Sequence, residues 1–381
     1  MAYFDNAATS YPKPECVYAF MDEFYRNHGG NAGRGNYTLA NTAKNMIEET
    51  RDLLKGILHC PAKQVIFTSS ATIALNMIIQ GVIRSGVKTV YITPFEHNAV
   101  TRTLHYFEEN GVINVIDLAV TDMLEYDYSR IRYQFEATKP DFVVVSHASN
   151  VIGLLAPVDR ILSLAKKHGA ITLVDMAQTA GLVDLDVGLE TIDFAVFAGH
   201  KTLMGPTGIS GFIMKPSFDL PPVLFGGTGY DSANQDMPSS LPERYEMGTI
   251  NSMGVAGLNA ALKWITDKTV AELFLEEERQ RKRLVALLED YDFIKLVGNY
   301  KERDYVGIVS ILLEGISSDS AGGLFSERNI SVRTGLQCAP KTHRFLGTYP
   351  AGTIRLSVNC MTGNQDFEEL RKALDDIGDN L

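Results

Sequence analysis

A lysine and an aspartate that follow two apolar segments are the first candidates for chemistry in this sequence. Asp175 ends the segment Ile171–Asp175, and Lys201 comes shortly after the segment Phe194–Ala198. Parallel strands place their C-terminal ends at one edge of a sheet, where α/β proteins bind ligands. A lysine beside a carboxylate at that edge suits an imine with pyridoxal 5′-phosphate (PLP), because the carboxylate keeps the pyridine nitrogen protonated. Taken singly, Asp175 is also a good helix N-cap and Lys201 an ordinary surface lysine.

Three further segments offer groups that a bound PLP would need. Gln178 can donate a hydrogen bond to the 3′-oxygen of the ring, and His97 can stack on its face. Residues 68–72 open a helix-like stretch, whose first N–H groups and hydroxyls suit a phosphate. Serine and threonine are also common helix caps, and a loop histidine is often solvated, so each signal by itself stays ambiguous.

A loop and a strand in the last third of the chain offer a nucleophile and an anion site. Glycine and proline residues flank Cys338 and mark a loop, and Arg333 lies five residues before the thiol, where a cation favours the reactive thiolate. Arg355 falls within a predicted strand, 353–358, and can hold a substrate carboxylate in a bidentate pair. An inert loop cysteine and a structural salt bridge are the alternatives.

These residues need a scaffold, and the pattern of apolar segments predicts one. Short runs rich in Val, Ile and Phe alternate with amphipathic stretches, as in a parallel sheet covered by helices. The predicted strands are residues 65–68, 88–93, 112–117, 142–147, 171–175 and 194–198, and the predicted helices between them are 71–84, 99–110 and 158–168. The fold class that we expect is therefore α/β.

Beyond residue 215 the pattern changes. Residues 216–254 are rich in proline and glycine and predict a long loop, of a kind that is often functional. A helical stretch, 255–290, follows in one piece or two. The segments 306–313, 320–328, 330–333, 353–358 and 366–377 then predict a smaller α+β domain. We expect a large domain over residues 15–260 and a small domain formed by residues 1–14 and 261–381.

Composition and charge limit the classes of partner. The 381 residues carry a net charge of −11, which argues against binding a nucleic-acid backbone. The chain shows neither a secretory signal pattern nor an apolar run long enough to span a membrane, so we expect a cytoplasmic protein. The four cysteines form no CxxC pair, so we expect neither a metal site nor a disulfide framework.

Several motifs together resemble the class V aminotransferase family, and within it the group II cysteine desulfurases and selenocysteine lyases. In chain order they are Phe4-Asp-Asn-Ala-Ala8, Glu96-His97, Ser146-His-Ala-Ser-Asn150, Val174-Asp-Met-Ala-Gln178, Gly199-His-Lys201, Tyr245-Glu-Met-Gly-Thr249 and Arg333-Thr-Gly-Leu-Gln-Cys338. The resemblance runs over nearly the whole chain. It implies the type I fold of PLP-dependent transferases, with a large domain built on a mostly parallel seven-stranded sheet and a smaller α+β C-terminal domain.

The resemblance also implies a role for each matching residue. Lys201 would form the Schiff base, Cys338 would be the sulfur-accepting nucleophile, and His97 would stack on the ring as the third catalytic residue. The residues implied to bind the cofactor are Ala71, Thr72, His97, Asn150, Asp175, Gln178, His200, Lys201 and Thr249, the last of them from the other subunit of a homodimer. The residues implied to hold the substrate are Asn150, Arg333 and Arg355.

The activity that the resemblance implies is a PLP-dependent cysteine desulfurase, which turns L-cysteine into L-alanine and leaves a persulfide on Cys338 for an acceptor protein. The alternatives within the family are a selenocysteine lyase, a kynureninase-like hydrolase and an aminotransferase. Outside the enzymes, the alternative is a scaffold that keeps PLP for stability. The sequence departs from the family at Ala198, often a phosphate-binding serine, at Ala71, often a threonine, and at Leu336 and Gln337, commonly histidines in group II.

Overall fold

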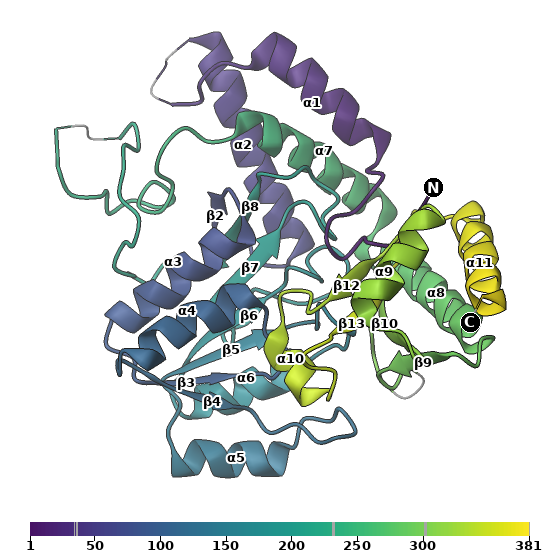
Figure 1. Ribbon diagram of the computed structural model, residues 1–381. Coiled ribbons are helices and arrows are strands. Elements are labelled where there is room, and N and C mark those ends of the chain that lie inside the picture. The colour runs from purple at the N-terminus through teal and green to yellow at the C-terminus, as the bar shows by residue number, and fades with distance from the viewer. Residues whose placement is uncertain (34, 36, 231–232, 301–302, 381) are drawn as a thin grey trace.

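A seven-stranded, mostly parallel sheet forms the centre of the computed structural model, which describes residues 1–33, 35, 37–230, 233–300 and 303–380 (Figure 1). Its strands are β2 (Gln64–Thr68), β3 (Thr89–Ile92), β4 (Asn114–Asp117), β5 (Phe142–Ser146), β6 (Ile171–Asp175), β7 (Phe194–Ala198) and β8 (Ser210–Met214). They lie in the order β2-β8-β7-β6-β5-β3-β4, and β8 alone runs antiparallel to its neighbours. The predicted α/β class and the seven-stranded sheet are confirmed.

The central strands are apolar on both faces because side chains on both sides of the sheet are buried. All five residues of β5, of β7 and of β8 are buried. In β5, Val143 and Val145 pack into one hydrophobic core, and Phe142 and Val144 pack into another. Burial of both faces explains why these strands are continuous apolar runs in the sequence rather than alternating ones.

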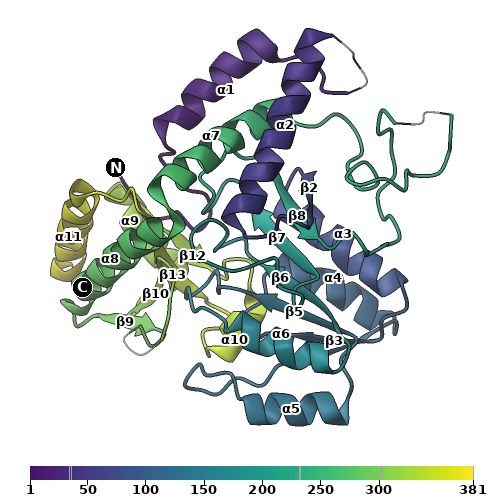
Figure 2. The same ribbon diagram turned by 180° about the vertical axis from the view of Figure 1, so that it is seen from behind.

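Two layers of helices flank the sheet (Figures 1 and 2). On one face lie α3 (Ala71–Arg84) and α4 (Asn98–Glu109). On the other face lie α2 (Thr38–Ile57), α5 (Tyr128–Ala137), α6 (Val158–Lys167) and α7 (Ser252–Lys268), with α1 (Glu15–His28) packed along α7. Among the described residues, no helix is both long and apolar enough to cross a membrane.

The C-terminal part of the chain builds a second, four-stranded antiparallel sheet. Its strands lie in the order β12-β13-β10-β9 and comprise β9 (Ile294–Val297), β10 (Ile308–Leu313), β12 (Arg333–Gly335) and β13 (Thr353–Ser357). The helices of this part are α8 (Val270–Glu289), α9 (Ser318–Glu327), α10 (Pro340–Phe345) and α11 (Asn364–Asp379). The N-terminus joins it, because β1 (Ala2–Tyr3) pairs with β11 (Ile330–Ser331), as the position of the N label in Figure 1 shows.

One predicted alternative is decided by the structure, and one predicted element differs. The helical stretch expected over 255–290, in one piece or two, forms two helices, α7 and α8, which meet at Thr269, whose φ is 66°. The predicted strand 330–333 is divided between β11, which pairs with β1, and β12, which joins the four-stranded sheet. The predicted domain boundary at residue 260 falls inside α7, so the division into a large and a small domain stays a prediction.

The structure contains several elements that the sequence pattern did not predict, among them α1, α2, α5, β8 and β9. The strand β8 begins with Ser210 and Gly211, which are poor strand formers. Glycine is nevertheless required, because a Cβ at position 211 would lie 2.2 Å from the carbonyl oxygen of Ile66 on β2. Close approach of two backbones thus selects a residue that strand propensity disfavours. The predicted long loop is confirmed, since the described residues of 215–251 form no helix or strand.

Candidate active site

A cavity of about 990 Å³ opens at the C-terminal ends of β5, β6 and β7. All the predicted site residues except Thr249 line it, namely Ala71, Thr72, His97, Asn150, Asp175, Gln178, His200, Lys201, Arg333, Cys338 and Arg355. They come from both sheets and from the loops between them. The fold therefore brings residues from three distant parts of the sequence to one place. The strand-end argument predicts this position for Asp175 and Lys201.

Asp175 and Lys201 lie in the interior of this cavity. Asp175 is 7 % exposed, and its Oδ1 accepts a hydrogen bond of 2.9 Å from the Ala177 N–H. Burial raises the pKa of Asp175, while that N–H group and the charge of Lys201 act against the rise. Burial lowers the pKa of Lys201 to about 8, with Asp175 opposing it. An amine with this pKa is partly neutral near neutral pH, and the neutral form is the one that forms imines and accepts protons.

The backbone at Lys201 is fixed by a tight turn and by the N-terminal segment. The carbonyl oxygen of Lys201 accepts hydrogen bonds from the Ser10 hydroxyl at 2.8 Å and from the Met204 N–H at 2.9 Å. The Gly205 N–H donates to the Gly199 carbonyl oxygen at 2.7 Å and closes the turn. The backbone from which the Lys201 side chain extends is thus held by contacts to its carbonyl oxygen and to the turn around it.

His97 and His200 are neutral in this cavity at neutral pH. Burial lowers the pKa of each to about 4, and the charge of Lys201 is the second cause for both. His97 caps α4, since its Nδ1 accepts a hydrogen bond of 3.0 Å from the Ala99 N–H. The ring of His97 therefore carries its proton on Nε2. Nδ1 of His200 is buried and has no hydrogen-bond partner among the described residues.

The N-terminus of α3 forms another wall of the cavity. Ser70 caps this helix, with its Oγ accepting a hydrogen bond of 3.3 Å from the Ile73 N–H. First-turn N–H groups have no partner within their own helix, so Ala71 and Thr72 offer theirs to a ligand. Ala198 also lines the cavity, and its methyl group offers no hydroxyl at the position where the family often has a serine.

Arg355 is buried in the wall of the cavity and pairs with Asp5, a residue to which the sequence analysis assigns no role. It is 3 % exposed, and its Nη2 forms an ion pair of 2.8 Å with Oδ1 of Asp5. Its Nη1 donates to the Asn150 carbonyl oxygen at 2.8 Å, and its Nε has no partner among the described residues. Asp5 belongs to the N-terminal family motif at residues 4–8, and this motif was the feature of the sequence that could have identified it. Arg333 is directly opposite Arg355 on the neighbouring strand β12 and is exposed.

Cys338 lies at the rim of the cavity, exposed, in the turn that follows β12. Its carbonyl oxygen accepts a hydrogen bond of 2.7 Å from the Asn98 N–H at the start of α4. The same residue lines an outer hollow of about 940 Å³, formed with residues of α3 and α4. Cys338 therefore adjoins both the interior of the site and its approach from outside.

Glu96 is a second residue whose importance sequence reasoning missed. Its buried carboxylate accepts three hydrogen bonds of 2.7 Å, from the Thr93 hydroxyl and from the hydroxyl and N–H of Ser146. Burial raises the pKa of Glu96 to about 7. Because Ser146 is paired with Asp175 across β5 and β6, Glu96 fixes the strand end beside that aspartate. The feature of the sequence that could have identified Glu96 is its position directly before His97 in a family motif.

Thr249 does not lie at this cavity. It lines a separate hollow of about 1420 Å³, together with Arg51 and Glu246. Arg51 and Glu246 form a buried ion pair of 2.8 Å, and Glu246 also accepts a hydrogen bond of 2.6 Å from the Phe67 N–H on the edge strand β2. The segment that leads to Thr249 is therefore attached to the edge of the sheet.

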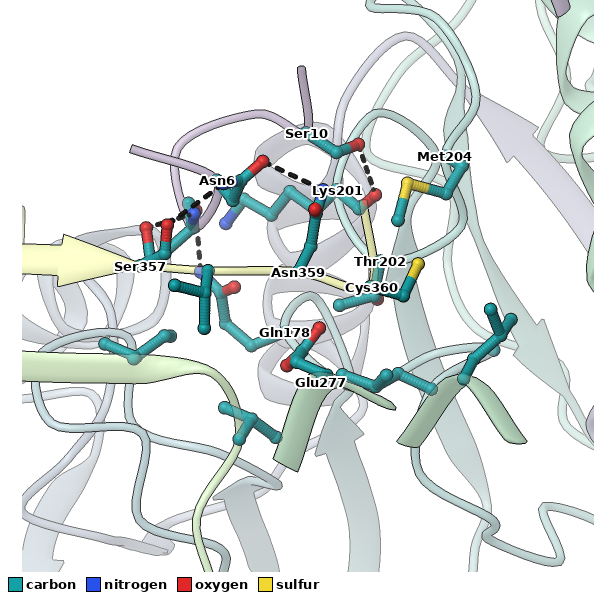
Figure 3. A pocket seen from close by; sticks show the side chains of 17 residues that line it. Asn6, Ser10, Gln178, Lys201, Thr202, Met204, Glu277, Ser357, Asn359 and Cys360 are labelled. Carbon is teal, nitrogen blue, oxygen red and sulfur yellow. Dashed lines mark hydrogen bonds between the residues drawn. The ribbon is translucent and has the colours of Figure 1, made fainter. Parts of the chain in front are cut away.

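A second, smaller cavity adjoins the first at Lys201 and Gln178, which line both (Figure 3). Asn359 donates to the Asn6 side-chain oxygen at 2.9 Å along one wall. From α8, Glu277 points its carboxyl group into this space, as Figure 3 shows. Its Oε1 accepts a hydrogen bond of 2.7 Å from the Gly307 N–H, and burial raises the pKa of Glu277 to about 7.

Replacing Glu277 with glutamine is expected to stabilise the protein above neutral pH. The folded-state pKa of about 7 lies above the ordinary 4.5, so the carboxyl favours folding fully below about 4.5 and loses this contribution as pH rises through 7. Glutamine keeps an acceptor for Gly307 and cannot ionise. Thermal unfolding at about pH 5 and about pH 8 should show an advantage that appears only at the higher pH, on the order of 2 kcal/mol.

The matched control is Glu23→Gln, which removes an exposed carboxylate from α1. This variant should show no such dependence on pH. An equal change in the stability of the Glu277 variant at both pH values would contradict the assignment of a buried, ionising carboxyl.

Comparisons with known proteins identify relatives of this chain over nearly its whole length. The family model described as Aminotransferase class-V matches residues 2–370. A probable cysteine desulfurase of Pyrococcus abyssi is 30% identical, over 100% of this chain and 94% of its own length, and one of Halalkalibacterium halodurans is 29% identical, over 98% and 92%. The apo structure of a cysteine desulfurase from Thermococcus onnurineus NA1 matches with a TM-score of 0.90 at 27% identity, covering 100% of this chain and 95% of that one. Because the family model spans almost the whole sequence, this chain belongs to the aminotransferase class-V family.

Proposed function

We propose that this protein is a PLP-dependent cysteine desulfurase, which takes the sulfur of L-cysteine, releases L-alanine and holds the sulfur as a persulfide on Cys338. The observation that carries the proposal is the position of Cys338, an exposed thiol at the rim of the cavity that contains Lys201 and Asp175. The relatives described as probable cysteine desulfurases support it. A kynureninase-like hydrolase or an aminotransferase has no need of a thiol at this place.

The residues present fit PLP, the cofactor that the class V family uses. The partnerless Nδ1 of His200 and the N-terminus of α3 suit a phosphate at one end of the cavity. Asp175 offers a carboxylate for a pyridinium nitrogen, and Lys201 offers the amine for an imine. Gln178 donates one N–H of its amide to the Ala7 carbonyl oxygen at 2.9 Å, and its second N–H can donate to a ring oxygen. Bound PLP supplies an electron sink for the negative charge that develops at the substrate Cα.

Side chains of the protein bind the substrate, transfer the proton and accept the sulfur. Nε of Arg355, unpaired among the described residues, is a donor available for a substrate carboxylate. The neutral amine of Lys201 takes the Cα proton and later returns a proton to the carbon skeleton. The thiolate of Cys338 attacks the substrate sulfur. A sulfur–sulfur bond forms as the carbon–sulfur bond breaks, the electron pair of the broken bond stays with carbon, and alanine leaves.

Two partners belong to this proposal. Thr249 lies away from the cavity of its own chain but on a segment attached to β2, which suits a contact with the phosphate in a second copy and therefore a homodimer. The outer hollow beside Cys338 offers a sulfur acceptor a way to the persulfide. Both are inferences that accompany the desulfurase activity.

A single-turnover experiment tests the activity. The PLP-loaded protein is incubated with L-cysteine without reductant, and its intact mass, its cofactor absorbance and the released alanine are measured. A gain of one sulfur atom with an equivalent of alanine supports a desulfurase. An absorbance response to L-cysteine without a mass gain contradicts it, and the same assay with L-selenocysteine then tests the lyase alternative.

A further inference from the structure

Gln337 directly precedes Cys338, but its side chain is engaged away from the thiol. It is 5 % exposed. Its Nε2 donates to the Thr353 carbonyl oxygen on β13 at 2.9 Å, and its Oε1 lies 2.8 Å from Nε2 of His343 on α10. Both ends of the amide are thus bound to two different elements of the C-terminal part.

The surrounding groups fix both the orientation of this amide and the tautomer of His343. A backbone carbonyl oxygen only accepts hydrogen bonds, so the amide atom facing Thr353 is the nitrogen. Burial lowers the pKa of His343 to about 4, and its Nδ1 lies 2.8 Å from the Thr348 hydroxyl. The neutral ring therefore accepts from Thr348 at Nδ1 and donates from Nε2 to Gln337.

The backbone of this turn adopts a conformation that needs support. Gln337 and Cys338 have φ values of 39° and 56°, in the left-handed region that residues other than glycine rarely occupy. Two successive residues of this kind persist only where their surroundings hold them. Asn150 Nδ2 donates to the Gln337 carbonyl oxygen at 2.7 Å, and the Asn98 N–H donates to that of Cys338 at 2.7 Å.

We propose that Gln337 is a positioning residue, whose amide binds β13 and α10 and thereby holds the left-handed turn that keeps Cys338 at the cavity. This inference rests on the proposed function, since it concerns the delivery of the nucleophile. It assigns Gln337 a role other than proton exchange with the thiol, because an amide does not titrate and both of its polar atoms are bound to other groups. Asn150 completes the turn from the cavity side, so the nucleophile and the interior of the site share one hydrogen-bonded network.

The test is the variant Gln337→Met, which keeps the length of the side chain and removes its hydrogen bonds. In the PLP-loaded enzyme we expect persulfide formation at saturating L-cysteine to slow by about 10- to 100-fold, since a small misplacement of a reacting group has this effect. The L-cysteine concentration that gives half of the cofactor absorbance change should move by less than about twofold, because binding does not use the thiol. Hydrogen exchange of peptides spanning residues 333–341 should become faster, with exchange elsewhere unchanged.

Gln280→Met is the matched control. Gln280 is equally buried at 5 % exposure, but it lies on α8 and binds Glu276. It should leave the persulfide rate and the exchange of residues 333–341 unchanged. His343→Leu removes the other half of the contact and is expected to reproduce the slower persulfide step, which keeps the proposal testable where Gln337→Met folds poorly.

The outcomes separate the inference from the proposed function. Unchanged exchange of residues 333–341 together with an unchanged persulfide rate overturns the positioning role. A loss that Gln280→Met shares equally also overturns it. Faster exchange in the Gln337 variant, in a protein whose wild type forms no persulfide, supports the positioning of the turn and overturns the desulfurase.

Discussion

The Lys201→Ala variant is expected to lose the imine absorbance of the bound cofactor and to release alanine from L-cysteine at least about 10³-fold more slowly than the wild type. A positioned general base alone contributes about 10²- to 10⁴-fold, and this lysine would also form the covalent link. Among the described residues that line the cavity, Lys201 is the one with a primary amine. Absorbance spectra and an alanine-release assay measure both effects.

Lys13→Met provides the control for Lys201. Lys13 lies nearby, where its Nζ donates to the carbonyl oxygens of Ser10 at 3.0 Å and His200 at 3.3 Å. Burial lowers its pKa to about 8, as for Lys201, but it does not line the cavity. The control variant should keep the imine absorbance. An imine band that survives Lys201→Ala would disprove the assignment of the Schiff base.

Cys338→Ser is expected to abolish the gain of one sulfur atom in the single-turnover experiment and to slow alanine release from L-cysteine by at least about 10²-fold. A hydroxyl at the same position is a far weaker nucleophile than a thiolate and gives no persulfide. The response of the cofactor absorbance to L-cysteine should remain, because Cys338 stands at the rim while Asp175 and Lys201 lie deeper. Mass spectrometry and absorbance therefore separate sulfur transfer from substrate binding.

Cys16→Ser is the matched control for this variant, since Cys16 is also a free, exposed thiol but lies on α1. It should gain sulfur as the wild type does. Full turnover with L-cysteine in the Cys338 variant would contradict the desulfurase mechanism. Loss of the absorbance response in that variant would instead show that Cys338 supports binding, which the geometry of the rim does not predict.

The sheet, and the placement of Asp175 and Lys201 at its edge, were predictable because their signals are local. Buried parallel strands such as β5 and β7 are short apolar runs whatever surrounds them, and Asp175 and Lys201 follow two of them. The alternation of strands and helices then places their C-terminal ends at one edge. The expected strands, the α/β class and the convergence of eleven named residues on one cavity follow from this rule and from the family motifs.

Elements without a local signal were harder to predict. The glycine of β8 satisfies a backbone contact with β2 that the sequence does not reveal, and the split of residues 330–333 depends on which partner strands reach them. The break between α7 and α8 occurs at Thr269, and threonine is not a residue type that predicts a positive φ. For β8 and for residues 330–333, a partner far away in the chain decides the local conformation.

The sequence by itself determined which chemical groups this protein has and in what order: a histidine, a carboxylate, a second histidine, an amine, and a thiol between two arginines. Only the tertiary structure decided how they are held. Asp5 pairs with Arg355 across 350 positions, Glu96 joins two strand ends, and Gln337 turns its amide away from Cys338. Buried polar groups must find partners wherever the fold offers them, so their roles depend on contacts between distant segments rather than on their neighbours in sequence.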